Sequence, residues 1–169
     1  IVFDVPEEYH ANINNPILGI TENSILIMRG CGSVGYPGSA EVVNMIPPDY
    51  LIQKGISELP CIGDGRQSGT SASPSILNAS PEAAVGGGLA YLQNGDTIRI
   101  DLNARTVNAL VPEDEWNHRK VNTPLPHLKH NSMYVEMFRN RVTQLGEGAY
   151  FKGIEDYKNL SEAELRHSH

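Results

Sequence analysis

The chain has 169 residues, of which 40% are hydrophobic and 20% are charged, and this composition is typical of one globular domain. Its formal net charge is −7 with histidine neutral, and its basic residues are scattered, which argues against nucleic acid or an anionic membrane as a partner. Because no apolar run approaches the roughly 18 residues of a bilayer-spanning helix, we expect a soluble, cytoplasmic protein with residues 1–169 in a single domain.

The first predicted elements are a strand, a long loop and a short helix. The β-branched and aliphatic run at residues 24–28 indicates a buried strand, and the glycine-broken segment 29–38 follows it as a shaped loop. Pro47 and Pro48 then open a short helix, because proline is tolerated in the first helical turn, and Gly55 ends it with a left-handed cap.

A second apolar strand is predicted at residues 59–62, and it also leads into a polar, glycine-rich loop at residues 63–73. Residues 80–86 combine an N-cap serine, a proline at the first helical position and a terminal glycine, so they predict a helix of one or two turns. A strand followed by a shaped loop therefore occurs twice in the first half of the chain.

Beyond residue 86 the side-chain period changes to two, which is typical of strands. Three strands are predicted there, at residues 89–92, 97–102 and 106–111. Asn-Gly and Asn-Ala turns separate them. These segments predict an antiparallel meander whose buried face carries Ile98, Ile100 and Leu102.

Helices are predicted to dominate the last third. Acidic residues begin and basic residues end a surface helix that starts at Pro112. A longer helix over residues 132–145 is stopped by Gly146 and has an apolar face that we expect in the core. That face consists of Met133, Met137, Phe138, Val142 and Leu145. A capping-box pattern that begins at Ser161 predicts a last short helix.

Strands in the first two thirds and a helical C-terminal third indicate a mixed α/β fold. We expect a barrel-like, largely antiparallel β core flanked by helices. A doubly wound parallel sheet is the weaker alternative, because the predicted meander has no crossover helices.

The two loops that follow apolar strands hold the candidate functional residues. Glu41 offers the carboxylate oxygen that Mg²⁺ prefers, although a solvated glutamate at a helix start has the same sequence signature. Ser68 and Thr70 either present hydroxyls to a ligand or bond locally in a turn. Asp64 and Arg66 either pair or brace the loop backbone. The residues alone leave these interpretations open.

Several standard motifs are absent from the sequence. The loops match neither a Walker A loop nor GxGxxG, and no GxSxG elbow surrounds Ser68, so nucleotide binding and hydrolase chemistry are not indicated. Cys31 and Cys61 lie in no CxxC pair and no zinc-type Cys/His spacing. We interpret both as buried or loop thiols, and a thiol nucleophile has no support from neighbouring residues.

One ordered set of motifs resembles a known family. Residues 63–70 (GDGRQSGT), 80–84 (SPEAA) and 94–102 (NGDTIRIDL) are similar to the C-terminal segment of the dihydroxy-acid dehydratase and phosphogluconate dehydratase family. Residues 35–42 (GYPGSAEV) and the closing residues 166–169 (RHSH) look most like the branch that acts on aldonic acids. The resemblance covers nearly the whole chain.

The resemblance implies a hydro-lyase that converts a 2,3-dihydroxy acid into a 2-keto acid and water, with Mg²⁺ and a 2Fe–2S cluster as cofactors. By position, Ser68 matches a serine thought to act as an alkoxide base, Thr70 a hydroxyl that contacts substrate, and Glu41 a ligand of Mg²⁺. The similar ending of the aldonate branch implies that His169 binds substrate, since a terminal imidazole can donate a hydrogen bond to a carboxylate or hydroxyl.

In that family the cluster cysteines and the remaining Mg²⁺ ligands belong to a larger N-terminal domain. The resemblance therefore implies a C-terminal domain that lacks the cluster ligands and is inactive alone. It also implies that this domain joins its N-terminal domain in a homo-oligomeric full-length enzyme. The competing hypothesis is an autonomous, non-catalytic module that holds a small acid or anion between the same two loops.

Overall fold

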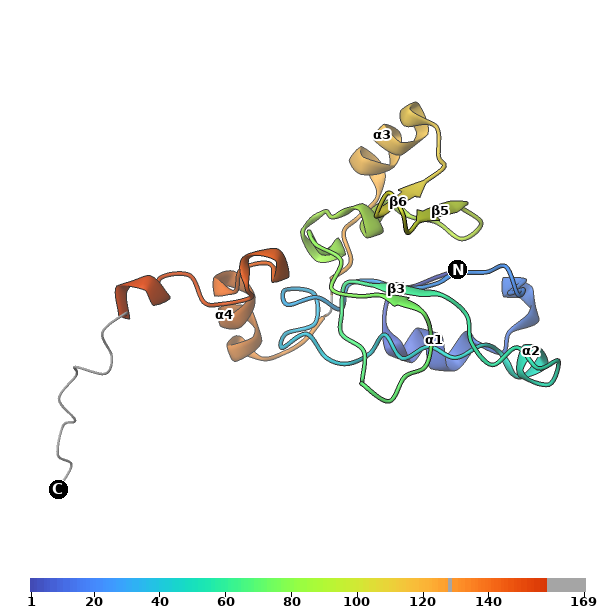
Figure 1. Ribbon diagram of the computed structural model, residues 1–169. Coiled ribbons are helices and arrows are strands. Elements are labelled where there is room, and N and C mark those ends of the chain that lie inside the picture. Colours follow the sequence, from blue (N-terminus) through green and yellow to red (C-terminus); the bar gives the residue numbers. More distant parts are fainter. Residues whose placement is uncertain (128, 158–169) are drawn as a thin grey trace, which may run out of the picture.

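The computed structural model describes residues 1–127 and 129–157 and shows a mixed α/β fold (Figure 1). Four short strands form one parallel sheet in the order β1 (Val2–Phe3), β2 (Leu26–Met28), β3 (Cys61–Gly63) and β4 (Ser75–Ile76). A separate antiparallel hairpin consists of β5 (Ile98–Asp101) and β6 (Thr106–Ala109). The two strands predicted near residues 24–28 and 59–62 are confirmed as the central strands β2 and β3.

The helices are short and lie between and after the strands. The α-helices are α1 (Pro6–Asn12), α2 (Asp49–Ile52), α3 (Glu113–Asn122) and α4 (Met133–Arg141). The 3₁₀ helices are η1 (Pro16–Leu18), η2 (Ala83–Val85), η3 (Gly88–Tyr91), η4 (Leu145–Glu147) and η5 (Ile154–Tyr157). Among the residues that the structure describes, no helix is long and apolar enough to cross a membrane.

The prediction of a barrel-like, largely antiparallel β core is wrong. The main sheet is parallel throughout, and the antiparallel ladder is confined to the β5–β6 hairpin. Parallel neighbours need crossover connections, and these contain α1 before β2 and α2 before β3. The helix predicted between Pro47 and Gly55 is α2, whose four residues form part of a crossover, whereas the seven-residue α1 is not among the predicted elements.

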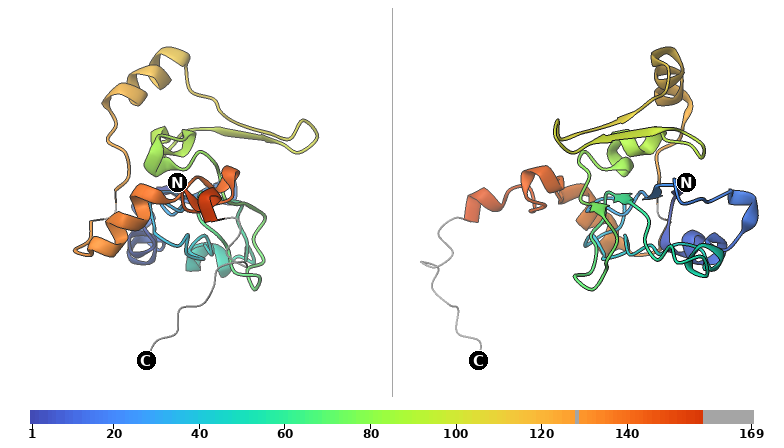
Figure 2. Two further views of the ribbon diagram at one scale, coloured as in Figure 1. Left: turned by 90° about the vertical axis from the view of Figure 1, so that its left-hand side faces the viewer. Right: turned by 45° about the vertical axis from the view of Figure 1, so that its right-hand side comes forward.

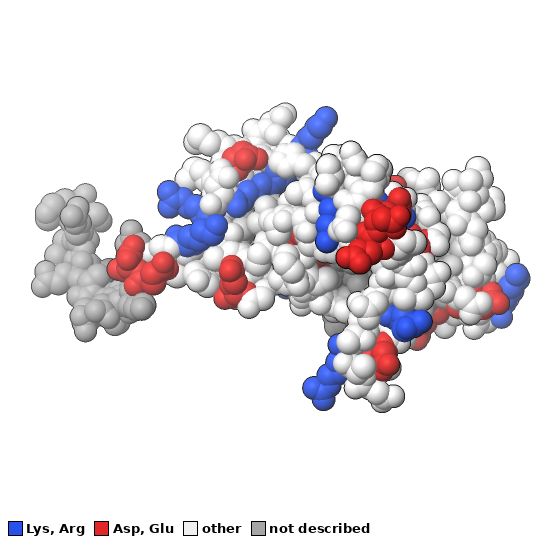
Figure 3. Space-filling view, turned by 90° about the horizontal axis from the view of Figure 1, so that it is seen from above, with Lys and Arg blue, Asp and Glu red and all other residues white. Residues whose placement is uncertain are grey.

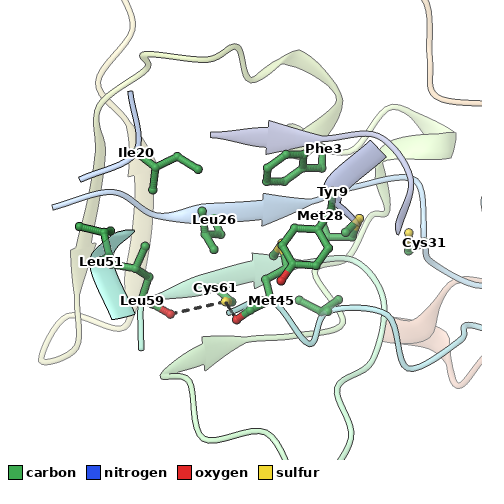
Figure 4. Packing of buried hydrophobic residues seen from close by; sticks show 11 residues of the cluster. Phe3, Tyr9, Ile20, Leu26, Met28, Cys31, Met45, Leu51, Leu59 and Cys61 are labelled. Atoms are coloured by element: carbon green, nitrogen blue, oxygen red, sulfur yellow. Dashed lines mark hydrogen bonds between the residues drawn. The ribbon is translucent and has the colours of Figure 1, made fainter. Parts of the chain in front are cut away.

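Both faces of the parallel sheet are covered, which explains why its central strands are continuously apolar. Successive side chains point to opposite faces, so Leu26 and Met28 enter one buried cluster and Ile27 enters another. Figure 4 shows the first cluster, where Tyr9 of α1 packs edge-on against Phe3. The hairpin and α3 lie on one side of the sheet, and α1 and α2 lie on the other (Figure 2).

The predicted three-stranded meander is correct only for its last two strands. The segment predicted as a strand at 89–92 is the 3₁₀ helix η3, and Arg29 accounts for the difference. Its guanidinium donates to the carbonyl oxygens of Leu89, Ala90 and Leu92 at 2.8 to 3.1 Å, so these groups are not available to a strand partner. Leu102, expected on the buried face, is 83% exposed because β5 ends at Asp101.

The helical third also differs in detail from the prediction. The helix predicted over 132–145 ends at Arg141, and Met133 and Met137 of its expected core face are exposed, whereas Val142 is buried. The helix of one or two turns predicted at 80–86 is the single 3₁₀ turn η2, which Gly86 ends with φ +87° as expected, but its N-cap is Glu82 and not Ser80. The short helix predicted from Ser161 lies outside the described residues.

Two buried carboxylates hold the loop after β2 in place. Asp64 has no exposed surface and accepts hydrogen bonds from the backbone N–H groups of Gly30, Cys31 and Ala83 at 2.8 to 3.0 Å. Burial raises the pKa of Asp64, and the three N–H groups oppose that shift. One side chain therefore joins the ends of β2 and β3 to η2.

Glu82 has the same role further along the loop. It is 1% exposed and accepts hydrogen bonds from Val34 N–H at 2.9 Å and Gly35 N–H at 2.8 Å. Gln144 also donates to it, at 2.8 Å. A Cβ on Gly32 would lie 2.4 Å from a Glu82 carboxylate oxygen, so only glycine fits this position. The loop therefore folds closely around the buried Glu82 side chain.

Two arginines attach the C-terminal helices to this framework. Arg139 of α4 donates to the carbonyl oxygens of Val34 at 2.9 Å and Gly35 at 3.0 Å. Arg119 of α3 pairs with Asp96 at 2.7 Å, and both side chains are nearly buried. Charged side chains that remain at the surface are interspersed, as one face shows in Figure 3.

Replacing Glu82 with alanine should destabilise the protein by at least ~3 kcal/mol, because the loop N–H groups would lose their acceptor while remaining buried. Urea denaturation of Glu82→Ala would measure this difference. Glu58→Ala is the matched control, since Glu58 is exposed and its truncation should change the free energy of unfolding by less than ~0.5 kcal/mol. Equal stability of the two variants would contradict the structural role of Glu82.

Candidate functional site

The two polar loops leave the same edge of the parallel sheet. β2 ends at Met28 and β3 ends at Gly63, and these two residues are paired in the ladder. Ligand sites of parallel sheets commonly lie outside the carboxyl ends of the strands. The loops that follow β2 and β3 therefore both begin at the edge of the sheet where a ligand site is expected.

Backbone hydrogen bonds join the two loops directly. Val43 N–H donates to the Arg66 carbonyl oxygen at 3.0 Å, and Arg66 N–H donates to the Ala40 carbonyl oxygen at 3.3 Å. The Arg66 Nε also donates to the Ser39 carbonyl oxygen at 2.6 Å. Hydrogen bonds to Arg66 therefore hold the chain to the second loop both before Glu41, at Ser39 and Ala40, and after it, at Val43.

Glu41 projects a partly hydrated carboxylate from this segment. Its Oε1 lies 3.6 Å from Arg66 NH1, and each side chain is 50% exposed. An ion pair this exposed contributes little to stability, so the carboxylate can exchange its arginine partner for another cation. Of the two roles considered for Asp64 and Arg66, the structure shows backbone bracing by both, while the charge partner of Arg66 is Glu41.

Ser68 and Thr70 form a hydroxyl pair on the second loop. Their oxygens are 3.0 Å apart, and Thr70 N–H approaches Ser68 Oγ at 3.4 Å. The pair lies in a turn closed by a bond from Ser71 N–H to the Ser68 carbonyl oxygen at 3.1 Å. Ser68 and Thr70 therefore bond locally in a turn, and their hydroxyl groups are also accessible at the surface.

Asn44 connects the hydroxyl pair with the segment that holds Glu41. Its Oδ1 accepts from Ser68 N–H at 2.9 Å, and its Nδ2 donates to the Glu41 carbonyl oxygen at 3.1 Å. Asn44 is not among the predicted site residues, because an isolated exposed asparagine has no distinctive sequence pattern. His169, the fourth predicted site residue, lies outside the described residues.

Glu41 is suited to contribute to a magnesium site but not to form one alone. Mg²⁺ is typically held by one or two carboxylates together with water and substrate oxygens, and a half-exposed carboxylate meets that requirement. Within residues 1–127 and 129–157, no group of three or more His, Cys, Asp or Glu side chains is placed to hold a metal. Further ligands would have to come from elsewhere.

The two cysteines do not fit an iron–sulfur cluster. Cys31 and Cys61 are both buried in the hydrophobic cluster between the sheet and α1. Burial raises the pKa of both thiols, so both are held in the protonated form. An iron–sulfur cluster is usually held by four cysteine thiolates, whereas these two thiols are packed among apolar side chains.

Comparison with known proteins identifies relatives along the whole chain. Residues 1–149 match the family described as "Dihydroxy-acid/6-phosphogluconate dehydratase C-terminal". All 169 residues align at 50% identity with 28% of a D-xylonate dehydratase from Caulobacter vibrioides. An L-arabinonate dehydratase from Rhizobium leguminosarum is 39% identical over 88% of the chain, and a dihydroxy-acid dehydratase from Clostridium beijerinckii is 38% identical over 88%.

The chain spans only about a quarter of the length of these relatives, 26% to 28% of each. The family match nevertheless includes both loops, the buried carboxylates and the helices up to η4. The resemblance found in the sequence motifs is thereby confirmed. The chain belongs to the dihydroxy-acid and 6-phosphogluconate dehydratase family, and its residues correspond to the C-terminal domain of that family.

Proposed function

We propose that the chain is the C-terminal domain of a sugar-acid dehydratase, a hydro-lyase that converts a 2,3-dihydroxy (aldonic) acid into a 2-keto-3-deoxy acid and water. The observation that carries the proposal is the convergence of the Glu41 segment and the Ser68–Thr70 hydroxyl pair. Similarity to D-xylonate and L-arabinonate dehydratases favours an aldonic acid over a branched-chain precursor as substrate.

The reaction requires a base at C2 of the substrate and assistance to the departing C3 hydroxyl. In the proposal, the ionised Ser68 Oγ accepts the C2 proton while the C3 hydroxyl departs and takes up a proton to become water, which leaves a C2–C3 enol. The enol then loses its hydroxyl proton and gains a proton at C3 to give the 2-keto-3-deoxy acid. A serine hydroxyl is a weak acid, so it must be ionised by a neighbouring positive charge. Mg²⁺, held in part by Glu41, would supply that charge and the Lewis acid for the leaving hydroxyl.

Thr70 complements Ser68 in this arrangement. Its Oγ1 is 3.0 Å from Ser68 Oγ, so it can donate a hydrogen bond to a negatively charged serine oxygen or to a substrate hydroxyl. The hydroxyl pair is partly exposed, which leaves space for a substrate beside it. We assign Thr70 to substrate binding, and we assign His169 to the same role on the basis of the sequence resemblance.

The remaining parts of the active site are proposed to lie in the N-terminal domain of the same enzyme. The chain covers a small fraction of each relative, and its cysteines do not fit the cluster. We therefore propose that the chain has no dehydratase activity alone and acts within a full-length homo-oligomer. Tight aldonate binding by the isolated chain, combined with an inactive full-length protein, would instead favour a non-catalytic binding module.

Ser68→Ala in the full-length enzyme should lower kcat by at least ~10²-fold, because general base catalysis typically contributes about that much. The folded state should be unaffected, since a loop hydroxyl adds little to the core. The measurements are 2-keto acid formation from D-xylonate or L-arabinonate and thermal unfolding. Ser57→Ala, an exposed serine outside the site, is the control, and equal activity of both variants would refute the assigned base.

Glu41→Gln in the full-length enzyme should weaken divalent cation binding by at least ~10-fold, because a neutral amide oxygen replaces a charged ligand. Binding of Mn²⁺ as a probe, followed by electron paramagnetic resonance, measures this effect without relying on turnover. Glu58→Gln removes the same charge from an exposed position outside the two loops and should bind Mn²⁺ like the wild type. Unchanged Mn²⁺ affinity in Glu41→Gln would exclude Glu41 as a ligand.

Deletion of residues 167–169 from the full-length enzyme should raise KM or lower kcat at least several-fold if His169 contacts substrate. The physical reason is the loss of an imidazole that can bond to a carboxylate or hydroxyl and that titrates near neutral pH. Steady-state kinetics on the best aldonate would measure the change. His169→Gln, which retains a hydrogen-bond donor, should recover part of the loss, and unaltered kinetics of the deletion would end this assignment.

A further inference from the structure

The candidate site is divided between two loops, so its geometry depends on how firmly the loops are held together. The backbone ladder between them includes Val43 and Arg66 but does not reach Ser68. Gln67 bonds to Ser71, and Ser68 bonds to Thr70 and Ser71. Among the described residues, the hydrogen bonds of segment 67–71 remain inside the segment with one exception.

The bond from Ser68 N–H to Asn44 Oδ1 is the exception, because it crosses to the first loop. The same amide group donates from Nδ2 to the Glu41 carbonyl oxygen. An asparagine amide combines an acceptor and a donor at one planar group, and both are used here in opposite directions. Asn44 therefore links the main chain at Glu41 to the main chain at Ser68.

The backbone of Asn44 is itself firmly anchored. Its two neighbours, Val43 and Met45, are both fully buried in the core below the sheet. The Met45 carbonyl oxygen also accepts hydrogen bonds from Ser73 Oγ at 3.2 Å and Cys61 Sγ at 3.5 Å. An exposed side chain thus extends from a fixed main chain, which is what a positioning group requires.

We infer that Asn44 is a positioning residue that holds the proton-accepting hydroxyl of Ser68 at a fixed spacing from the cation-binding carboxylate of Glu41. This inference rests on the proposed function. Asn44 does not touch the reacting atoms and acts only through the main chain of its two partners. A displacement of about 1 Å in such a site can cost up to ~10²-fold in rate, so the loss of this link should affect turnover more than substrate binding.

The test uses the full-length enzyme with Asn44→Ala, Asn44→Asp and the control Asn12→Ala. Asn12 also makes one exposed amide-to-carbonyl bond, to Glu8 at 2.9 Å, but it lies on α1 away from the loops. Asn44→Ala should lower kcat by about 10- to 100-fold with KM changed by less than about three-fold. Asn44→Asp keeps the acceptor for Ser68 N–H and should recover at least part of kcat. Asn12→Ala should match the wild type.

Millisecond amide hydrogen exchange, followed by mass spectrometry, provides a second readout that is independent of activity. The peptide containing residues 67–71 should exchange several-fold faster in Asn44→Ala than in the wild type, whereas peptides from the sheet should not change. Faster exchange with unchanged kcat would overturn the inference, because Asn44 would then only brace the loop. Unchanged exchange would overturn it as well.

The same experiment separates a failure of this inference from a failure of the proposed function. A wild-type enzyme that dehydrates no aldonate would contradict the proposed function, and the exchange comparison would still decide whether Asn44 holds Ser68. An active wild type with equal kcat in Asn44→Ala would contradict only the inference. A loss of kcat in Asn44→Ala that Asn44→Asp does not recover, accompanied by faster exchange throughout the sheet, would show a general folding defect and overturn the positioning role.

Discussion

The fold depends on two carboxylates, Asp64 and Glu82, that are buried beside a loop rich in glycine. Main-chain N–H groups of such a loop have no strand or helix partners, and leaving them unpaired inside the protein would be costly. Asp64 accepts three of them, and Glu82 accepts those of the next turn. Because the same two side chains belong to the segments after β3 and before η2, they connect the sheet, the loop and the C-terminal part through shared bonds.

Arginines complete this framework by binding main-chain carbonyl oxygens. Arg29 holds η3 against the sheet, and Arg139 holds α4 against the loop. Strands of only two to four residues can therefore form a defined sheet, since bonds from charged side chains add to the hydrophobic contacts. The polar loops of the candidate site extend from this rigid base, and Asn44 belongs to the same pattern of side chains bonded to main chain.

Sequence reasoning identifies the elements whose signal is local. The segments at β2 and β3 are found because both of their faces are buried, and the β5–β6 hairpin because its period and turns are clear. The parallel pairing could not be predicted from the sequence, because β1 and β4 have only two residues each and form strands only by pairing with β2 and β3. Glu41, Ser68 and Thr70 come from the family resemblance, whereas the role of Asn44 emerges only when the two loops lie together.

The long sequence separation within the Glu82 network has a consequence for how the protein is made. The Glu82 carboxylate bonds to Val34, 48 positions before it, and to Gln144, 62 positions after it. Contacts so distant in sequence slow folding, because a long segment must be ordered before they form. During synthesis the loop N–H groups can find the Glu82 carboxylate early, but the bonds that Arg139 and Gln144 add to this network can form only after those residues have left the ribosome.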